Sequence, residues 1–381
     1  MNQPDGIGAR IQLADTDQKI ACAAEELVNT TGSVAIDAER SDSFHYGQDA
    51  KLIQIKRGAG TTWLIDPIRP LTDIAAAIQN VPWIIHAGMN DYPSLAEAGL
   101  RWQNLTDTEI AAQLAGEEKI GLAPLVKKYF GVEMTKEYQR ADWSRRPIPD
   151  SWLAYAAADV EYLRELAEIL NEILVEQGRD EWLRQEMREF ENWRPGIPDT
   201  QPWLEHAHRA EFKTPYRYTL LREFWIARDK YAKQRDLAPG RVVSNKALVA
   251  AAASGPNSTR DLYRILKENN VWKLQRAQPL KKALWAVMDG SIDIEERPCL
   301  PRSLPRDGLW RSLNPEAADR YRQLHETIAE LANQLGIKAH LILSAPMQRQ
   351  LAWENPDNPG EYLRAAGARP WQIELLENEI G

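Results

Sequence analysis

Two acidic residues follow a short apolar run in the stretch SVAIDAER, residues 33–40. The run Val34 to Ile36 is typical of a buried strand, and Asp37 and Glu39 come directly after it. Residues two apart in a strand point to the same side, so the two carboxylates would be neighbours. Such a pair is unfavourable unless a cation lies between them, and Mg²⁺ is a cation that binds carboxylate oxygens. A solvated Glu39 beside a strand-ending Asp37 is the alternative interpretation of this stretch alone.

Two further acidic residues could complete such a site. Asp91, in WIIHAGMNDYPSL, follows a second strand-like run and lies in the first turn of an expected helix, where the helix dipole also favours aspartate. Asp159, in YAAADVEYL, comes four residues after Tyr155 and therefore shares a helix face with it. The small residues Ala156 and Ala158 would let this helix pack closely against a sheet. A helix with Tyr155 and Asp159 facing solvent is the alternative.

Charge is distributed unevenly along the 381 residues. The chain has 47 Lys and Arg against 55 Asp and Glu, which gives a formal net charge of -8. Residues 211–290 alone contain 16 basic and 7 acidic residues, so the rest of the chain is strongly acidic. A basic block within an acidic chain favours nucleic-acid binding through that block, with a solvated helical surface as the alternative.

Several classes of protein are excluded by composition. No apolar run approaches the ~20 residues that a membrane span needs. The N-terminal stretch MNQPDGIGARIQLADTDQ lacks the basic-then-apolar order of a secretory signal. The only cysteines, Cys22 and Cys299, are far apart and indicate neither a disulfide framework nor a zinc site. We therefore expect a cytoplasmic protein that does not bind membranes.

Three structural units are expected. Residues 1–192 alternate strand and helix signals, with strands first and helices after, which predicts an α/β or α+β domain built on one mixed sheet. Residues 193–210 are rich in proline and predict a linker. Residues 211–293 are helical, residues 294–316 form a second proline-rich linker, and residues 317–381 are helical again.

The acidic residues, taken in order, resemble the signature of the DEDD exonucleases. The members of the signature are Asp37, Glu39, Asp91 and Asp159, with Tyr155 four residues before the last. Five sequence motifs are similar to those of the ribonuclease D family, and the resemblance covers residues 25–190. The motifs are HAGMNDYPSL, LTDTEIAAQLAG, GLAPLVKKYFGV, KEYQRADWSRRPIP and YAAADVEYL. The tyrosine places the chain in the tyrosine branch, and the resemblance implies a ribonuclease H-like fold for this domain.

The resemblance also implies an activity. A 3′-5′ exoribonuclease would trim the 3′ ends of structured RNAs such as tRNA precursors and release nucleoside 5′-monophosphates. Two divalent ions, Mg²⁺ or Mn²⁺, would be its cofactors. Asp37 would bridge both ions, Glu39 and Asp159 would complete the first site, and Asp91 would hold the second, while Tyr155 would orient the attacking water. A DNA-directed exonuclease of the same fold and a catalytically silent RNA-binding protein are the alternatives.

Other segments are interpreted through the same resemblance. Lys136, Arg140 and Arg146 precede the Tyr155 helix and could hold substrate phosphates. Residues 211–290 resemble an HRDC module (helicase and RNase D C-terminal) in APGRVVSNKALVAAA and GPNSTRDLYRI, which implies nucleic-acid binding. Residues 317–381 look like a second, degenerate HRDC-like helical bundle with a packing role. RNA with a free 3′ end is the expected partner of a monomeric enzyme.

Overall fold

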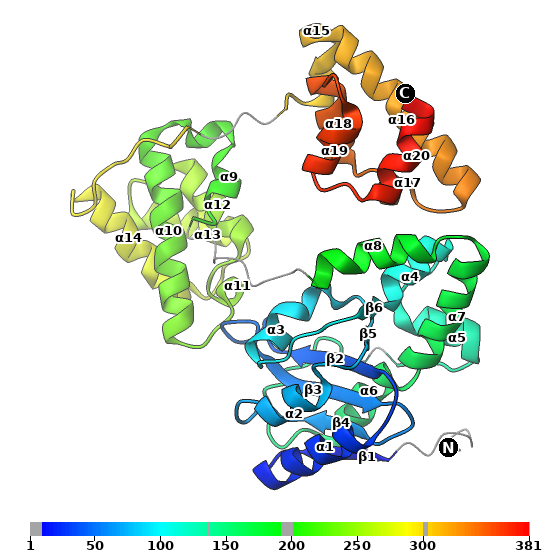
Figure 1. Cartoon of the computed structure of the whole chain (residues 1–381). Coiled ribbons are helices and arrows are strands. Elements are labelled where there is room, and N and C mark those ends of the chain that lie inside the picture. The colour runs from blue at the N-terminus through cyan, green and yellow to red at the C-terminus, as the bar shows by residue number, and fades with distance from the viewer. Residues whose placement is uncertain (1–9, 136, 192–200, 300–303, 381) are drawn as a thin grey trace.

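The computed structural model describes residues 10–135, 137–191, 201–299 and 304–380. It shows an N-terminal α/β domain followed by two all-helical domains (Figure 1). Lys136, predicted as a substrate contact, lies outside the described residues. Within these ranges no helix is both long and apolar enough to cross a lipid bilayer.

The α/β domain is built on one mixed sheet. Its strands, in spatial order, are β1 (Ile11–Ala14), β4 (Thr62–Ile65), β3 (Ala50–Arg57), β2 (Val34–Arg40), β5 (Trp83–Ile85) and β6 (Leu105–Asp107). Strand β3 pairs antiparallel with β2 and β4, whereas the other neighbours are parallel. The predicted mixed sheet is therefore confirmed. The short edge strand β1 was not foreseen, because four residues carry too little periodicity.

Helices cover both faces of the sheet. Side chains such as Ile36 and Ile53 pack on the face covered by α1 (Asp17–Asn29) and α2 (Thr72–Ile78). The other face carries Ala35, Leu52 and Leu64 and is covered by α6 (Asp150–Glu161) and α7 (Leu163–Glu176). Since side chains alternate along β2, Asp37 and Glu39 share the α6 side with Ala35.

The remaining helices of this domain surround the end of the sheet near β5 and β6. They are η1 (Gly88–Asn90), α3 (Tyr92–Glu97), α4 (Thr108–Ala115), α5 (Leu122–Phe130) and α8 (Asp180–Glu191). Gly88 has no space for a side chain, because a Cβ there would lie 2.8 Å from Ile85 and 2.9 Å from Tyr92. This close packing sets the path of the chain from β5 into α3.

The first helical domain has its own hydrophobic core. Its helices are α9 (Leu204–Ala207), η2 (Ala210–Lys213), α10 (Pro215–Gln234), α11 (Pro239–Val242), α12 (Asn245–Ser254), α13 (Thr259–Glu268), η3 (Leu274–Ala277) and α14 (Gln278–Met288). Trp203 and Ala207 are buried in this core beside Phe212. The core therefore begins earlier than residue 211, within the segment predicted as linker, because the proline-rich sequence also contains apolar anchors.

The second helical domain repeats the order of helices seen in the first. Its helices are η4 (Asp307–Leu309), α15 (Trp310–Leu313), α16 (Pro315–Leu335), α17 (Ala339–Ile342), α18 (Ala345–Glu354), α19 (Pro359–Ala365) and α20 (Pro370–Ile380). A long helix, a single turn and a ten-residue helix follow one another in both domains. The ten-residue helix is capped by Ser244 in one and by Ser344 in the other, each accepting a backbone N–H three residues later. Trp310 is buried, so this domain also begins within its predicted linker.

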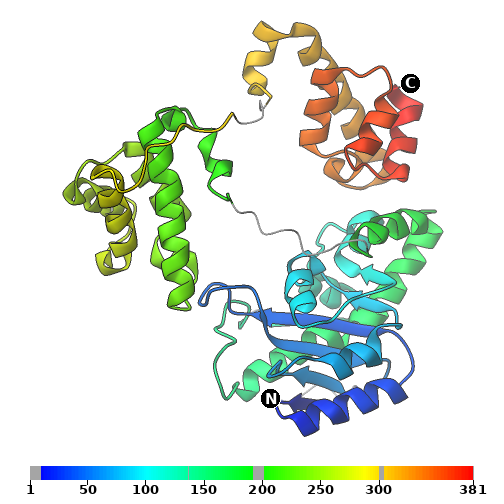
Figure 2. The ribbon, with the colours of Figure 1, turned by 60° about the vertical axis from the view of Figure 1, so that its left-hand side comes forward.

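The second helical domain contacts the α/β domain along α8 (Figure 2). The ring of Trp371 stacks on Trp182 with centroids 4.5 Å apart, and its indole N–H donates to Glu186 at 2.9 Å. The Arg369 guanidinium lies 3.2 Å from the same Glu186 carboxylate. Arg179 donates at 2.6 Å to the carbonyl oxygen of Leu335, at the end of α16. An aromatic stack with charged partners therefore joins the two domains.

We expect the substitution Trp371→Ala to destabilise the protein by about 3–5 kcal/mol, because it removes a buried ring and the indole N–H that donates to Glu186 Oε1. Chemical denaturation measures this loss. Trp272→Ala is the matched control, since that ring is 70% exposed, and it should change the stability by less than ~0.5 kcal/mol. Equal unfolding midpoints for the two variants would contradict the assigned packing role of Trp371.

Candidate active site

Three of the predicted acidic residues come together between β2 and α6. One carboxylate oxygen of each of Asp37, Glu39 and Asp159 lies within 4.8 Å of the others. All three side chains are half-buried. Strand β2 supplies the first two from one face, and α6 supplies the third. The helix therefore faces the sheet with Asp159, and the solvent-facing alternative for this residue is wrong.

Small side chains allow α6 to lie this close to the sheet. Ala156 and Ala157 are buried against Leu52 and Leu64, and Val160 is buried in a neighbouring cluster. The alanines fill little space, so the helix backbone approaches the strands closely. Ala156 thus has the packing role expected from the sequence.

Asp91 lies at the N-terminal end of α3 and has a different partner. Its Oδ1 is 2.8 Å from Nη1 of Arg40, and its side chain is only 9% exposed. Arg40 also donates to the carbonyl oxygen of Asn90. Strand β2 therefore supplies a cation to Asp91 from the residue directly after Glu39. Asp91 is not in the three-carboxylate group, and sequence reasoning missed its ion pair because the two residues are far apart in the chain.

A second buried aspartate positions the loop that carries Asp91. Asp107, at the end of β6, accepts the backbone N–H groups of Ala87 at 3.0 Å and Gly88 at 2.9 Å. It also accepts the N–H of Glu109 at 2.8 Å and so caps α4. Sequence reasoning missed this residue, although an aspartate just before a helical run is a recognisable capping signal.

The acidic cluster is electrostatically strained without a cation. Burial, with the nearby charges of Asp37 and Asp159, raises the pKa of Glu39 to about 10. Burial also raises the pKa of Asp159 to about 8 and that of Asp37 to about 6, although Arg40 opposes the shift at Asp37. The pKa of Asp91 is likewise raised well above its ordinary value, chiefly by burial. The four acids are therefore not all ionised at neutral pH unless positive charge is added.

Tyr155 lies beside the cluster, held by aromatic side chains. Its ring centroid is 6.2 Å from that of the fully buried Trp143 and 5.8 Å from that of Tyr138. Burial and the charge of Asp159 raise the pKa of its hydroxyl above the ordinary value. The phenol therefore stays protonated and can donate a hydrogen bond, but it is unsuited to act as a base.

The predicted substrate-binding arginines differ in their surroundings. The guanidinium of Arg146 donates to Asp66 Oδ1 and to the carbonyl oxygens of Trp143 and Lys51, each at 2.8 Å. It ties the segment before α6 to the sheet, a role that sequence reasoning missed. Arg140 is exposed in the turn before this segment. Phosphate contacts by either residue stay a prediction.

The donor set fits a divalent metal ion. The three clustered residues offer only carboxylate oxygens, which are the ligands of hard ions such as Mg²⁺ and Mn²⁺. Their raised pKa values show that added positive charge would be favourable at this place. The structure thus fits the predicted use of divalent metal by this domain.

Comparison with known proteins agrees with this geometry. Residues 11–175 match the family described as 3′-5′ exonuclease, and residues 218–276 match the HRDC domain. Residues 303–380 match a family described as 3′ to 5′ exonuclease C-terminal domain. One HRDC match is thus found, and the predicted count of two HRDC bundles is not confirmed.

Individual relatives cover most of the chain. Ribonuclease D of Shewanella sp. is 30% identical over 336 residues, which span 86% of this chain and 83% of the relative. Ribonuclease D of Bartonella henselae is 26% identical over 87% of this chain and 80% of its own length. A crystal structure of a protein from Bifidobacterium adolescentis has a TM-score of 0.78 at 27% identity, covering 98% of this chain and 95% of the other. Escherichia coli RNase D shares the fold, with a TM-score of 0.66 at 23% identity over 97% and 99% of the two chains.

The sheet and the acidic cluster define a 3′-5′ exonuclease with a ribonuclease H-like fold, followed by a helical HRDC domain. The chain belongs to the ribonuclease D family. Its activity is that of a hydrolytic 3′-5′ exoribonuclease, and RNA is its substrate.

We expect the metal-free protein to lose stability as the pH rises from about 5 to about 8. Carboxyl groups with raised pKa values hold more protons in the folded than in the unfolded state, so their stabilising contribution is lost as pH rises through the folded pKa. Added Mg²⁺ or Mn²⁺ should raise the melting temperature more at the higher pH, because protons compete less with the metal. Differential scanning calorimetry with and without chelator measures both effects.

The variant Glu39→Gln isolates the source of this effect. It should raise the melting temperature of the metal-free protein at about pH 8 by about 2–4 °C, the shift that ~1 kcal/mol produces in a domain of this size. It should also reduce the shift caused by metal. Glu205→Gln, at an exposed position in α9, is the control and should behave as the wild type. Identical pH and metal responses in Glu39→Gln and wild type would refute the electrostatic account.

We expect Asp107→Ala to weaken metal binding although Asp107 is not among the clustered carboxylates. The change leaves the Ala87 and Gly88 N–H groups without their acceptor, at a cost of about 1–3 kcal/mol for each buried donor, and loosens the loop before Asp91. Titration calorimetry with Mn²⁺ and chemical denaturation measure the two effects. Asp357→Ala, at an exposed position in the second helical domain, is the control. Unchanged Mn²⁺ affinity in a destabilised Asp107→Ala protein would limit Asp107 to a structural role.

Proposed function

We propose that this enzyme trims the free 3′ ends of structured RNAs, such as tRNA precursors, by hydrolysis assisted by two divalent metal ions. The observation that carries the proposal is the group of three carboxylates within 4.8 Å of one another, in a chain of the ribonuclease D family. A free 3′ end suits a site that holds one terminal nucleotide at a time.

Asp37 would contact both ions, because its charge acts on Glu39, Asp91 and Asp159 alike. Glu39 and Asp159 would complete the first site. Asp91 would hold the second ion. The ion pair with Arg40 uses Asp91 Oδ1, and the carboxylate has a second oxygen that could serve a metal. Bound there, two Mg²⁺ or Mn²⁺ ions would supply activation of water and stabilisation of the leaving oxygen.

Tyr155 would orient the attacking water. Its protonated hydroxyl can donate one hydrogen bond to a water oxygen, and the rings of Trp143 and Tyr138 hold it in place beside the cluster. Attack by that water at the last phosphodiester bond breaks the bond to the 3′ oxygen of the preceding nucleotide. The product is a nucleoside 5′-monophosphate, and the shortened RNA keeps a 3′ hydroxyl.

The helical domains would serve RNA binding and packing. The basic block 211–290 coincides with the HRDC domain, so we assign RNA backbone contacts to this domain. The second helical domain would be a divergent HRDC-like bundle, because it has the same order of helices and a serine cap at the same place. Its contacts with α8 favour a packing role. We further propose that the enzyme acts as a monomer in the cytoplasm.

A time course on a 3′-extended tRNA labelled at its 5′ end tests the proposed activity. We expect a ladder that shortens from the 3′ end with Mg²⁺ or Mn²⁺ and that is abolished by chelator. Asp37→Asn should slow the reaction by at least about 10²-fold, since it removes a carboxylate charge that would hold the metal ions, whereas Asp357→Asn should not.

Two further outcomes decide between the alternatives. A substrate whose last residues lack the 2′ hydroxyl, if degraded as fast as RNA, would favour a DNA-directed exonuclease of the same fold. RNA that is bound but stays intact with every metal would favour a catalytically silent RNA-binding protein.

A further inference from the structure

The segment directly after the catalytic strand β2 contacts the HRDC domain. The N–H of Ala238 donates to the carbonyl oxygen of Phe44 at 3.0 Å. Arg241 donates from Nε to the carbonyl oxygen of Ser43 at 2.7 Å, and its guanidinium lies 4.1 Å from the centre of the Phe44 ring. A chain segment that begins at the metal-binding acids therefore forms part of the interface with the HRDC domain.

Tyr46 adds a second set of contacts to this interface. Its backbone N–H donates to Asp236 Oδ1 at 3.1 Å, and its hydroxyl lies 3.0 Å and 3.1 Å from the two carboxylate oxygens of Asp229. Asp229 lies on α10 and Asp236 lies just after it. The segment 43–46 is thus held by α10 and by the turn that leads into α11.

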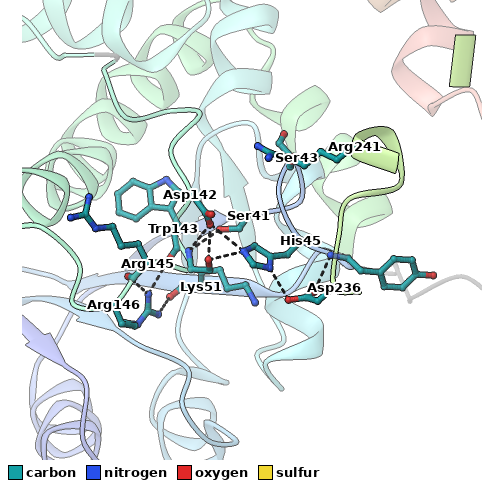
Figure 3. Close-up of polar contacts among 12 residues, drawn as sticks. Ser41, Ser43, His45, Lys51, Asp142, Trp143, Arg145, Arg146, Asp236 and Arg241 are labelled. Atoms are coloured by element: carbon teal, nitrogen blue, oxygen red, sulfur yellow. Dashed lines mark hydrogen bonds and ion pairs between the residues drawn. The ribbon is translucent and has the colours of Figure 1, made fainter. Parts of the chain in front are cut away.

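His45 is the residue of this segment that contacts both domains (Figure 3). On the HRDC side, its Nδ1 lies 2.7 Å from Asp236 Oδ2. On the other side, its Nε2 lies 2.8 Å from the hydroxyl oxygen of Ser144 and 3.5 Å from Asp142 Oδ1. One imidazole ring therefore bridges the HRDC domain and the segment that precedes α6.

The segment on the nuclease side is tightly connected. The Ser144 hydroxyl donates to Asp142 Oδ1 at 2.6 Å, and the Ser144 N–H donates to the hydroxyl of Ser41 at 2.9 Å. Trp143 lies between Asp142 and Ser144 in the chain, is fully buried and packs beside Tyr155. A continuous path of contacts thus runs from the HRDC domain through His45 and the 142–144 segment to Tyr155.

We propose that His45 is a positioning residue, through which the docked HRDC domain holds Trp143, and hence Tyr155, in place for the reaction. The inference rests on the proposed role of Tyr155 in orienting water. It assigns to the HRDC domain a structural effect on the catalytic centre in addition to RNA binding. Small displacements at a catalytic group lower the rate strongly, so a loosened Tyr155 should lower kcat.

Two conservative substitutions separate the two sides of the bridge. In His45→Asn the side-chain amide takes the place of Nδ1 and keeps the contact with Asp236, whereas in His45→Gln it takes the place of Nε2 and keeps the contact with Ser144. His45→Ala removes both contacts. Arg241→Ala weakens docking of the HRDC domain without touching the 142–144 segment, and His208→Ala, at an exposed position, is the matched control.

The first measurement is hydrogen–deuterium exchange of the segment 142–155 in the full-length protein. We expect faster exchange in His45→Ala and His45→Asn, partial protection in His45→Gln, and faster exchange in Arg241→Ala as well. His208→Ala should match the wild type. Unchanged exchange in His45→Ala, or in Arg241→Ala, would overturn the proposed coupling.

The second measurement is steady-state kinetics on a short single-stranded oligoribonucleotide that is too short to reach the HRDC domain. We expect kcat to fall about 10-fold in His45→Ala with little change in KM, and His45→Gln to recover most of the loss. A change in KM alone would overturn the positioning role. Because the exchange measurement needs no catalysis, an inactive wild type would overturn the proposed function and leave the coupling to be decided by exchange.

Discussion

Repulsion among half-buried carboxylates is the constraint on which the rest of the site depends. Asp37, Glu39 and Asp159 lie close enough to share an ion, and burial makes their negative charge unfavourable without one. The surrounding structure holds them together nevertheless. The mixed sheet fixes the two acids of β2, the alanines of α6 bring the third against them, and Arg40 offsets the charge of Asp91. Repulsion among the carboxylates lowers the free energy of unfolding of the metal-free protein. A bound cation removes this repulsion, which adds to the affinity of the site for the cation.

The loops that complete the site are held by partners distant in the chain. Asp107 fixes the turn before Asp91 through two backbone N–H groups, and Arg146 fixes the segment before α6 through Asp66 and main-chain carbonyl groups. Both sets of polar contacts are buried or half-buried, and satisfied contacts of this kind hold a single well-defined geometry. The clustered acidic side chains thus depend on neighbours held in a fixed geometry, as a binding site of defined shape requires.

The two helical domains also hold parts of the α/β domain through contacts across the domain interfaces. The second helical domain is attached to α8 through the Trp371–Trp182 stack, and the HRDC domain is attached to the segment that leaves β2. Each interface combines a ring contact with hydrogen bonds to charged groups. The HRDC domain therefore contacts the chain directly after the strand that bears Asp37 and Glu39, whereas the second helical domain contacts α8.

Local patterns in the sequence were enough for part of this description. An apolar run followed by acids two apart determined one face of β2, and helical spacing determined that Tyr155 and Asp159 lie together, because both follow from the periodicity of a single element. The ordered motifs determined the family. Tertiary structure alone decided which side of α6 meets the sheet, the pairing of Arg40 with Asp91, the anchoring of the Asp91 loop by Asp107 and the bridge made by His45. These contacts join residues far apart in the chain. A local sequence pattern does not indicate which distant side chain will lie beside a given residue, because that depends on how whole helices and strands pack.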